Sequence, residues 1–298
     1  MIKHLFIKFL GRASVVCLIL FRVPIHAQNC ESLEKELKSH VKFLSGDALR
    51  GRMTGGKEEA LVNTYLETAF SDNKERTIFE ISYRTNYQGK LLKSTMCTCF
   101  QNKKQVNTVL VGAHVDHIGM GGELSKSIGK SDVHNGADDN ASGVAMVIEL
   151  QKYFSKVNLP FNVLFVAYTG HEIGTKGSEY LATHWKKKWG NCIAVINFDM
   201  IGRLEDSSSS LFVSSNNPDF FKVASNHMNL VYDEGERLNL LDTRHFVHLP
   251  CITFSTGIHS DYHKISDDED AILYAGMCQQ FILYQTMIAN ISTKEQKK

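Results

Sequence analysis

Two adjacent carboxylates, Asp138 and Asp139, lie in the segment His-Asn-Gly-Ala-Asp-Asp-Asn-Ala-Ser-Gly, which spans residues 134–143 and precedes an apolar helical pattern. Like charges this close in a tight turn are costly unless a cation lies beside them. Imidazole and carboxylate groups suit zinc, and a shared carboxylate can bridge two ions about 3.5–4 Å apart. The sequence therefore predicts a dinuclear zinc site formed by residues that converge in the fold. The predicted ligands are His114, Asp139, Glu172, Asp199 and His263.

These ligands are predicted by their joint placement rather than by any one of them. His114 follows an apolar run over residues 109–113, Glu172 follows a run over 161–168, and two further runs precede the last two ligands. A single Asp after a strand is commonly a helix cap or turn residue, and a single His is commonly only hydrogen-bonded. Five such residues, all expected at one edge of a sheet, are hard to explain in that way.

Apolar runs that alternate with helical patterns indicate an α/β fold with a largely parallel sheet. In such sheets the binding site lies beyond the carboxyl ends of the strands, where the predicted ligands fall. We therefore expect three layers, α/β/α, around a mostly parallel, mixed central sheet with a hairpin at its edge. The expected strands cover residues 77–83, 91–100, 109–113, 161–168, 192–198, 211–213 and 251–256, and the expected helices cover 31–44, 57–70, 144–154, 174–186, 218–230 and 271–291.

The composition is that of an ordinary globular protein. Of the 298 residues, 43% are hydrophobic and 22% are charged, and the formal net charge is +1. This balance suits a single domain with a sizeable core and implies no nucleic-acid partner. The basic runs at residues 186–188 and 297–298 are expected to be solvated surface.

The first residues resemble a secretory signal peptide. Lys3, Lys8 and Arg12 form a positive start, residues 13–21 form a short apolar core, and Ala27 offers a small residue for cleavage. The apolar core is too short for a membrane span, although an N-terminal anchor is the alternative. We expect residues 1–27 to be removed, residues 28–298 to form one domain, and the protein to be exported to the periplasm or the medium.

Six cysteines remain after the expected cleavage. An exported protein could pair some of them, and the sequence leaves the pairing open. Cys97 and Cys99 alternate on an expected strand and therefore share one face, far from any His and Asp cluster, which argues against metal binding. The six are Cys30, Cys97, Cys99, Cys192, Cys251 and Cys278.

Five motifs occur in a fixed order and cover nearly the whole expected mature chain. They are Gly-Ala-His-Val-Asp-His at 112–117, Asn-Gly-Ala-Asp-Asp-Asn-Ala-Ser-Gly at 135–143, Gly-His-Glu-Ile-Gly at 170–174 with Gly177-Ser178, Asn-Phe-Asp-Met-Ile-Gly at 197–202, and Thr-Gly-Ile-His-Ser-Asp-Tyr-His at 256–263. Through these motifs, residues 44–272 resemble the zinc aminopeptidases of metallopeptidase family 28. That family includes bacterial leucyl aminopeptidases, with glutamate carboxypeptidase and glutaminyl cyclase as relatives.

The resemblance implies a role for each predicted ligand. His114 and Asp199 would hold one zinc ion, Glu172 and His263 the other, and Asp139 would bridge the two. Asp138 would instead hold the turn, and the peptide bond after Asp139 would be cis. Asp116 would orient His114 from behind, as metal-bound histidines usually require. His117 is expected to pack near the site without binding metal, and His245, His248 and His259 to lie at the surface or behind the ligands.

The sequence departs from the family at the position of the general base. The family has Glu-Glu, of which the first residue is the base and the second a ligand, whereas this chain has His171-Glu172. His171 could itself be the base, because two neighbouring dications favour its neutral form. Alternatively another group acts at a reduced rate, or the protein binds metal with little activity. Loss of a general base costs about 10²–10⁴-fold in rate.

The resemblance thus implies an exported dinuclear zinc exopeptidase, an aminopeptidase that hydrolyses the first peptide bond of peptides or proteins. The alternatives are a carboxypeptidase, a glutaminyl cyclase, or a weakly active relative that binds metal or peptides. A cyclase needs an indole-lined pocket, and Trp185 and Trp189 lie in a lysine-rich segment expected to be exposed, which argues against it. Leu241-Asp242-Thr243 replaces the family's Ser-Asp-His, a difference that concerns substrate preference.

Overall fold

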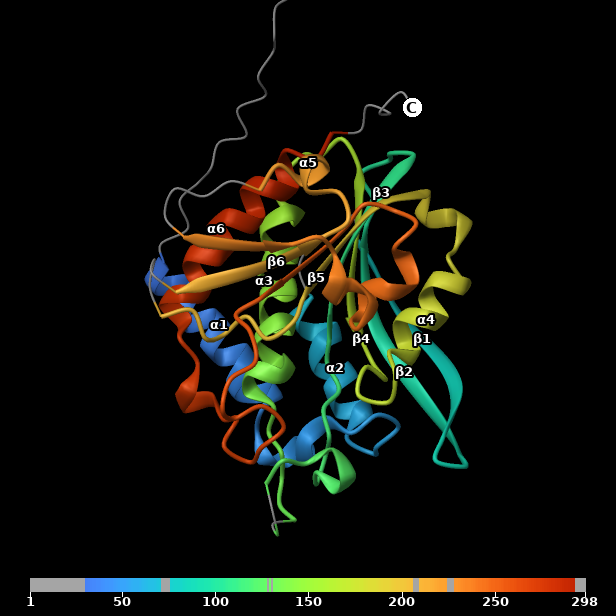
Figure 1. Cartoon of the computed structure of the whole chain (residues 1–298). Coiled ribbons are helices and arrows are strands. Elements are labelled where there is room, and N and C mark those ends of the chain that lie inside the picture. The colour runs from blue at the N-terminus through green and yellow to red at the C-terminus, as the bar shows by residue number, and fades with distance from the viewer. Residues whose placement is uncertain are drawn as a thin grey trace, which may run out of the picture.

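A computed structural model describes residues 30–70, 76–127, 129, 131–205, 209–223 and 228–292 of the chain. At its centre lies an eight-stranded sheet with the strand order β1-β2-β4-β3-β5-β8-β6-β7 (Figure 1). The strands are β1 (Arg76–Tyr87), β2 (Lys90–Gln101), β3 (Asn107–His114), β4 (Asn162–Tyr168), β5 (Asn191–Phe198), β6 (Ser210–Ser215), β7 (Asn229–Asp233) and β8 (Cys251–Ser255).

The four strands at the centre of the sheet are parallel. β3 pairs in parallel with β4 and β5, and β5 pairs in parallel with β8. Antiparallel pairs flank this centre, since β2 pairs with β4 on one side and β6 pairs with β8 on the other. The mixed, mostly parallel sheet confirms the α/β prediction. The carboxyl ends of β3, β4, β5 and β8 consequently meet at one edge, where the predicted ligands follow them.

Helices cover both faces of the sheet, as the three-layer prediction requires. Side chains of β3 alternate between the two faces, so that Val109 and Val111 join the core beneath α1, α3 and α6, whereas Leu110 joins the core on the side of α4. Figure 1 shows these two helical layers on either side of the strands. The helices are α1 (Cys30–Leu44), α2 (Glu59–Ala69), α3 (Gly143–Ser155), α4 (Lys176–Thr183), α5 (Pro218–Phe221) and α6 (Tyr274–Ala289).

The helix expected over residues 218–230 is the main error of the sequence analysis. Among the described residues of this range, only α5 (Pro218–Phe221) is helical, and Lys222 ends it with a φ of 49° in the left-handed region. The strand β7 (Asn229–Asp233) follows instead and pairs in parallel with β6. Its central Leu-Val-Tyr sequence favours a strand at the sheet edge over a helix. Here pairing with a neighbour overrides a weak helical pattern.

One disulfide joins the two ends of the described chain. Cys30 in α1 pairs with Cys278 in α6, with their Cα atoms 5.9 Å apart and a sequence separation of 248. The pair therefore fastens the first helix to the last across one face of the sheet. Cys97 and Cys99 are both buried and lie on one face of the sheet, as the sequence predicted.

The described helices include none with the length and apolar character needed to cross a bilayer. The signal peptide expected over residues 1–27 lies outside the described residues.

Removing the disulfide should destabilise the protein strongly. Cys278→Ser opens a loop of 248 residues, so the free energy of unfolding should fall by about 2–5 kcal/mol. Denaturant unfolding measures this loss, and Cys192→Ser, at a partly exposed cysteine outside the disulfide, is the matched control. Equal stabilities of the two variants would show that the disulfide does not form.

Candidate metal centre

The structure brings the five predicted ligands together at the carboxyl edge of the sheet. His114 is the last residue of β3, Asp199 directly follows β5, and Glu172 follows β4 in a loop. Asp139 lies in the turn that leads into α3, and His263 lies in the loop after β8. The parallel pairing of the central strands thus positions ligands that are up to 149 residues apart in sequence, from 114 to 263.

Asp139 lies between the other four side chains and divides its two oxygens between them. Its Oδ1 lies 3.3 Å from His114 Nε2, which in turn lies 3.8 Å from Asp199 Oδ2. Its Oδ2 lies 3.3 Å from His263 Nε2, which also lies 3.3 Å from Glu172 Oε2. The residues form two adjacent groups that share one carboxylate, the arrangement expected of a bridging ligand.

Four of the atoms that could bind metal in this centre lack a hydrogen-bond partner. A buried polar atom without a hydrogen bond is costly and requires an explanation. Several such atoms converge here, and imidazole nitrogens with carboxylate oxygens are the donors that zinc prefers. The residues therefore fit a pair of zinc ions. Within the described part of the chain, the fully buried atoms without a hydrogen-bond partner include His114 Nε2, Asp139 Oδ2, Asp199 Oδ2 and His263 Nε2.

The buried carboxylates of the centre also favour bound cations. Burial opposes protonation of His114, yet the carboxylates around it raise its pKa to about 9. Burial also opposes protonation of His263, yet Asp139 and Glu172 raise its pKa to about 10. Burial favours a neutral Glu172, but the neighbouring imidazoles lower its pKa to about 2. The buried carboxylates thus favour positive charge beside them, which metal ions would supply while the ligating imidazoles stay neutral.

Asp138 holds the turn around the bridging residue, as predicted. Its Oδ1 accepts hydrogen bonds from Ser142 Oγ at 2.9 Å and from the backbone N–H of Gly202 at 2.6 Å. Its Oδ2 lies 3.1 Å from His259 Nε2, so His259 lies behind the ligands. The peptide bond between Asp139 and Asn140 is cis, in agreement with the resemblance.

Two buried charged residues that the sequence analysis missed support the same turn. Asp267 accepts hydrogen bonds from the backbone N–H groups of Asp138 and Asp139, at 3.0 Å each. Arg52 donates to the backbone oxygens of Asn135 at 2.6 Å and Gly136 at 2.9 Å. Neither residue stands in a motif. Their roles depend on contacts 83 to 129 residues apart in sequence, so spacing gave no indication of them.

Asp116 supports the centre in two ways. Its backbone oxygen accepts a hydrogen bond from His114 Nδ1 at 3.0 Å, which turns His114 Nε2 toward the other ligands. Its carboxylate accepts the backbone N–H groups of His171 and Glu172, at 3.2 Å each, and the hydroxyl of Thr54 at 2.7 Å. The carboxylate itself lies 3.8 Å from His114 Nδ1. Asp116 thus orients His114 mainly through its backbone and fixes the loop that carries Glu172.

His171 lies beside the ligands and is held by a carboxylate. Its Nδ1 lies 2.9 Å from Asp242 Oδ2, and Asp242 Oδ1 accepts a hydrogen bond from Ser178 Oγ at 2.6 Å. Burial opposes protonation of His171, but Asp242 raises its pKa. Its ring stacks on that of His114, with 3.8 Å between centroids and 9° between planes. Because the lone pair of an imidazole lies in the ring plane, two parallel rings cannot point at one ion, which favours proton transfer over ligation for His171.

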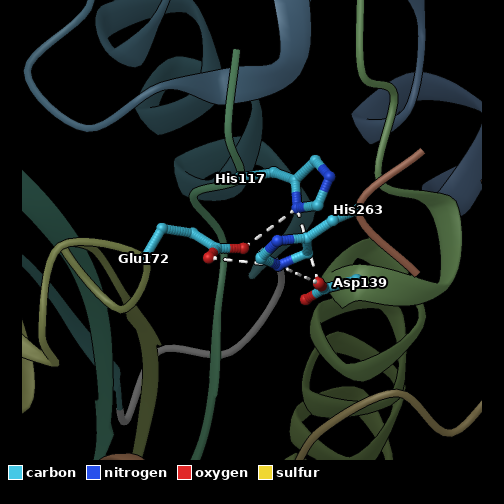
Figure 2. Close-up of side chains that lie close together, drawn as sticks. All are labelled: His117, Asp139, Glu172 and His263. Carbon is cyan, nitrogen blue, oxygen red and sulfur yellow. Dashed lines mark hydrogen bonds and ion pairs between the residues drawn. The ribbon is translucent and has the colours of Figure 1, made fainter. Parts of the chain in front are cut away.

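His117 packs directly beside the ligands, near the site as expected. Its Nδ1 lies 3.1 Å from Glu172 Oε1 and 3.6 Å from Asp139 Oδ2. Figure 2 shows its imidazole next to that of His263, with dashed lines to the carboxylates of Glu172 and Asp139. The donor atoms of these four residues all lie within 4.8 Å of one another. By contrast, His245 binds Thr175 Oγ1 at 2.8 Å, and His248 is exposed.

The fold and the site together define the class of zinc-dependent hydrolases, and comparison with known proteins agrees. The model of peptidase family M28 matches residues 96–282, which is more than half of the chain. The chain therefore belongs to peptidase family M28.

The matching relatives differ in their described activities. A probable zinc metalloprotease of Pyrenophora teres f. teres is 28% identical over 167 residues, which cover 55% of this chain and 31% of that protein. The chain thus spans about a third of the length of this curated relative. The crystal structure of the LapA aminopeptidase of Legionella pneumophila has a TM-score of 0.66 at 15% identity, covering 88% of this chain and 76% of that one. Glutaminyl cyclase of Bacteroides thetaiotaomicron has a TM-score of 0.69 at 16% identity, covering 87% and 98%. At these identities the two structures establish the fold alone.

Removing the negative charge of Asp267, which binds the turn that carries Asp139, should weaken metal binding. In Asp267→Asn, a neutral amide replaces the carboxylate that accepts hydrogen bonds from the backbone of Asp138 and Asp139. Loss of a hydrogen-bonding group behind a metal ligand typically lowers metal affinity by about 10–100-fold. Titration with zinc under a competing chelator measures this, and Asp270→Asn, at an exposed position three residues further on, is the control. An Asp267→Asn protein that binds zinc as tightly as the control would contradict the supporting role.

Proposed function

We propose that this protein is an exported aminopeptidase that uses a dinuclear zinc centre to release the first residue of peptides, and that residues 28–298 form its one peptidase domain. The observation that carries the proposal is the convergence of His114, Asp199, Glu172 and His263 on the shared carboxylate of Asp139. When bound, two zinc ions would supply an activated water and polarise the scissile carbonyl.

His171 is the proposed general base. Asp242 fixes its Nδ1, which leaves Nε2 as the nitrogen that can exchange a proton with water or with the leaving amine. Bound dications would oppose the positive charge that Asp242 alone favours, and the ring would then be neutral enough to accept a proton. A carboxylate that orients an imidazole in this way is a known means of activating it as a base.

Export is supported by the pattern of residues 1–27 and by the disulfide between Cys30 and Cys278. Disulfides form and persist mainly in oxidising compartments outside the cytosol. Fractionation of a bacterial host that expresses the whole chain, with mass spectrometry of the mature N-terminus, tests this part. We expect the chain outside the cytoplasm and its N-terminus at Gln28. A cytoplasmic chain that keeps Met1 would contradict export.

A glutaminyl cyclase is the second candidate, because cyclases share this fold. The positions of the two tryptophans do not support a cyclase. Trp189 is fully buried, contrary to expectation, and its backbone oxygen binds Thr108 Oγ1 near the start of β3. His114 lies at the other end of that strand, so this indole is far from the metal centre. Trp185 donates its indole N–H to the Gly190 oxygen in the same segment.

Turnover of aminoacyl nitroanilides tests the proposed activity. We expect hydrolysis of substrates with a free amino terminus, its loss with a chelator and its return with zinc. Formation of pyroglutamyl products from N-terminal glutaminyl peptides without release of amino acids would favour the cyclase. Turnover only of N-blocked substrates would exclude an aminopeptidase, and no turnover with two zinc ions bound would favour a binding protein.

Substitution of the proposed base should slow catalysis without removing the metal. We expect His171→Ala to reduce kcat by about 10²–10⁴-fold while zinc content stays at the wild-type level. Asp242→Asn should also reduce kcat, because it leaves His171 without its anionic partner. His184→Ala, an exposed histidine that bonds only within its own helix region, is the control. Wild-type turnover by His171→Ala would show that another group is the base.

A further inference from the structure

Four side chains surround one point of the centre, and His117 is the member that no motif assigns to the metal. His117 and His263 alternate with Glu172 and Asp139 around this point, as Figure 2 shows. His117 Nδ1 lies 3.1 Å from Glu172 Oε1 and 3.6 Å from Asp139 Oδ2. His263 Nε2 lies 3.3 Å from the same Asp139 oxygen and 3.3 Å from the other Glu172 oxygen, Oε2. All four residues are almost completely buried, so no water layer separates them from one another.

With one oxygen taken from each carboxylate, Asp139 Oδ2 and Glu172 Oε2, the remaining nitrogen–oxygen distances of 3.6, 3.3 and 3.3 Å are close to those between donors in a tetrahedral zinc site. Zinc binds nitrogen and oxygen at about 2.0–2.1 Å, and the edge of a tetrahedron of that radius is about 3.3–3.4 Å. Two imidazoles and two carboxylates at such separations form a complete set of donors for one ion. The same test applied to His114, Asp139 and Asp199 yields three donors, with nitrogen–oxygen distances of 3.3 and 3.8 Å.

The orientation of the His117 ring allows ligation. Its plane lies at 82° to that of His263, with 5.5 Å between centroids, so the in-plane lone pairs of the two rings can meet at one point. The ring is also confined. The backbone N–H of His117 donates to the Arg52 oxygen at 3.3 Å, and a Cβ added to Gly136 would lie 2.6 Å from His117 Cγ. Gly136 therefore leaves the space that the imidazole occupies.

We propose that His117 is a fourth protein ligand of the zinc ion held by Asp139, Glu172 and His263. One site of the pair is then closed by four protein donors, as in structural zinc sites, while the other keeps three donors and an open position, as in catalytic sites. The open site lies beside the His171–Asp242 pair. The closed site fills first and holds the bridging carboxylate in place for the second ion. This inference rests on the zinc centre of the proposed function.

The competing explanation is that His117 only donates a hydrogen bond to Glu172 and orients it. His117→Asn distinguishes the two roles, because the asparagine amide can donate from near the position of Nδ1 but is a poor zinc ligand. If His117 only orients Glu172, the asparagine keeps that hydrogen bond and zinc binding is unchanged. If His117 is a ligand, the variant loses one zinc ligand. His117→Ala, with and without added imidazole, is the second variant and keeps the test usable if the amide disturbs folding.

The experiment measures metal binding and not peptide turnover, so failure of the peptidase assay leaves its result standing. Apoprotein receives one equivalent of zinc, and X-ray absorption counts the imidazoles around it, while calorimetry measures its affinity. We expect two imidazoles in the wild type and one in His117→Asn, with affinity for the first ion reduced by about 10–100-fold or more. Imidazole should restore the spectrum of His117→Ala.

His134→Ala is the matched control. His134 is a buried histidine in a neighbouring loop whose two nitrogens bind Ser125 Oγ at 2.7 Å and the Asp132 oxygen at 2.9 Å. Its loss should leave the first zinc with two imidazoles. One imidazole per zinc in the wild type, or wild-type affinity in His117→Asn, would overturn the proposal.

Discussion

The structure depends on the burial of one carboxylate, that of Asp139, between two groups of imidazole and carboxylate side chains. Three carboxylates at this place repel one another, and burial removes the water that would screen them. Zinc ions would balance this charge, since each brings two positive charges to the point where the donors converge. Much of the surrounding architecture serves to hold these groups in place against their repulsion.

That support comes from the backbone as much as from side chains. Asp267 and Arg52 bind opposite sides of the turn that carries Asp139, one through N–H groups and the other through carbonyl oxygens. The carboxylate of Asp116 likewise accepts backbone N–H groups of the loop that carries Glu172. The parallel strands bring the loops to one edge, and these buried charges then fix the loops to within hydrogen-bond distances. A metal centre that must form before the ions arrive needs both levels of support.

The ligands could be predicted from sequence because they follow apolar runs whose parallel arrangement is itself predictable. The α/β class and the strand ends follow from such local patterns, whereas the turn role of Asp138 was implied by the family resemblance. Asp242 and Asp267 could not be found in this way, because each acts through a partner 71 or more residues distant and stands in no periodic pattern. His117 was visible in a motif, but its position relative to Glu172 depends on how two loops pack. The strand β7 was missed because a weak helical pattern over residues 218–230 outweighed the short Leu-Val-Tyr segment, whose partner β6 cannot be identified from local sequence.

The central claim is that Asp139 bridges two metal ions. Crystals of the zinc-loaded protein, with anomalous scattering recorded at the zinc absorption edge, test it most directly. We predict two peaks about 3.5–4 Å apart, one beside His114 and Asp199 and the other beside Glu172 and His263, with Asp139 between them. A single peak, or two peaks of which only one contacts Asp139, would contradict it.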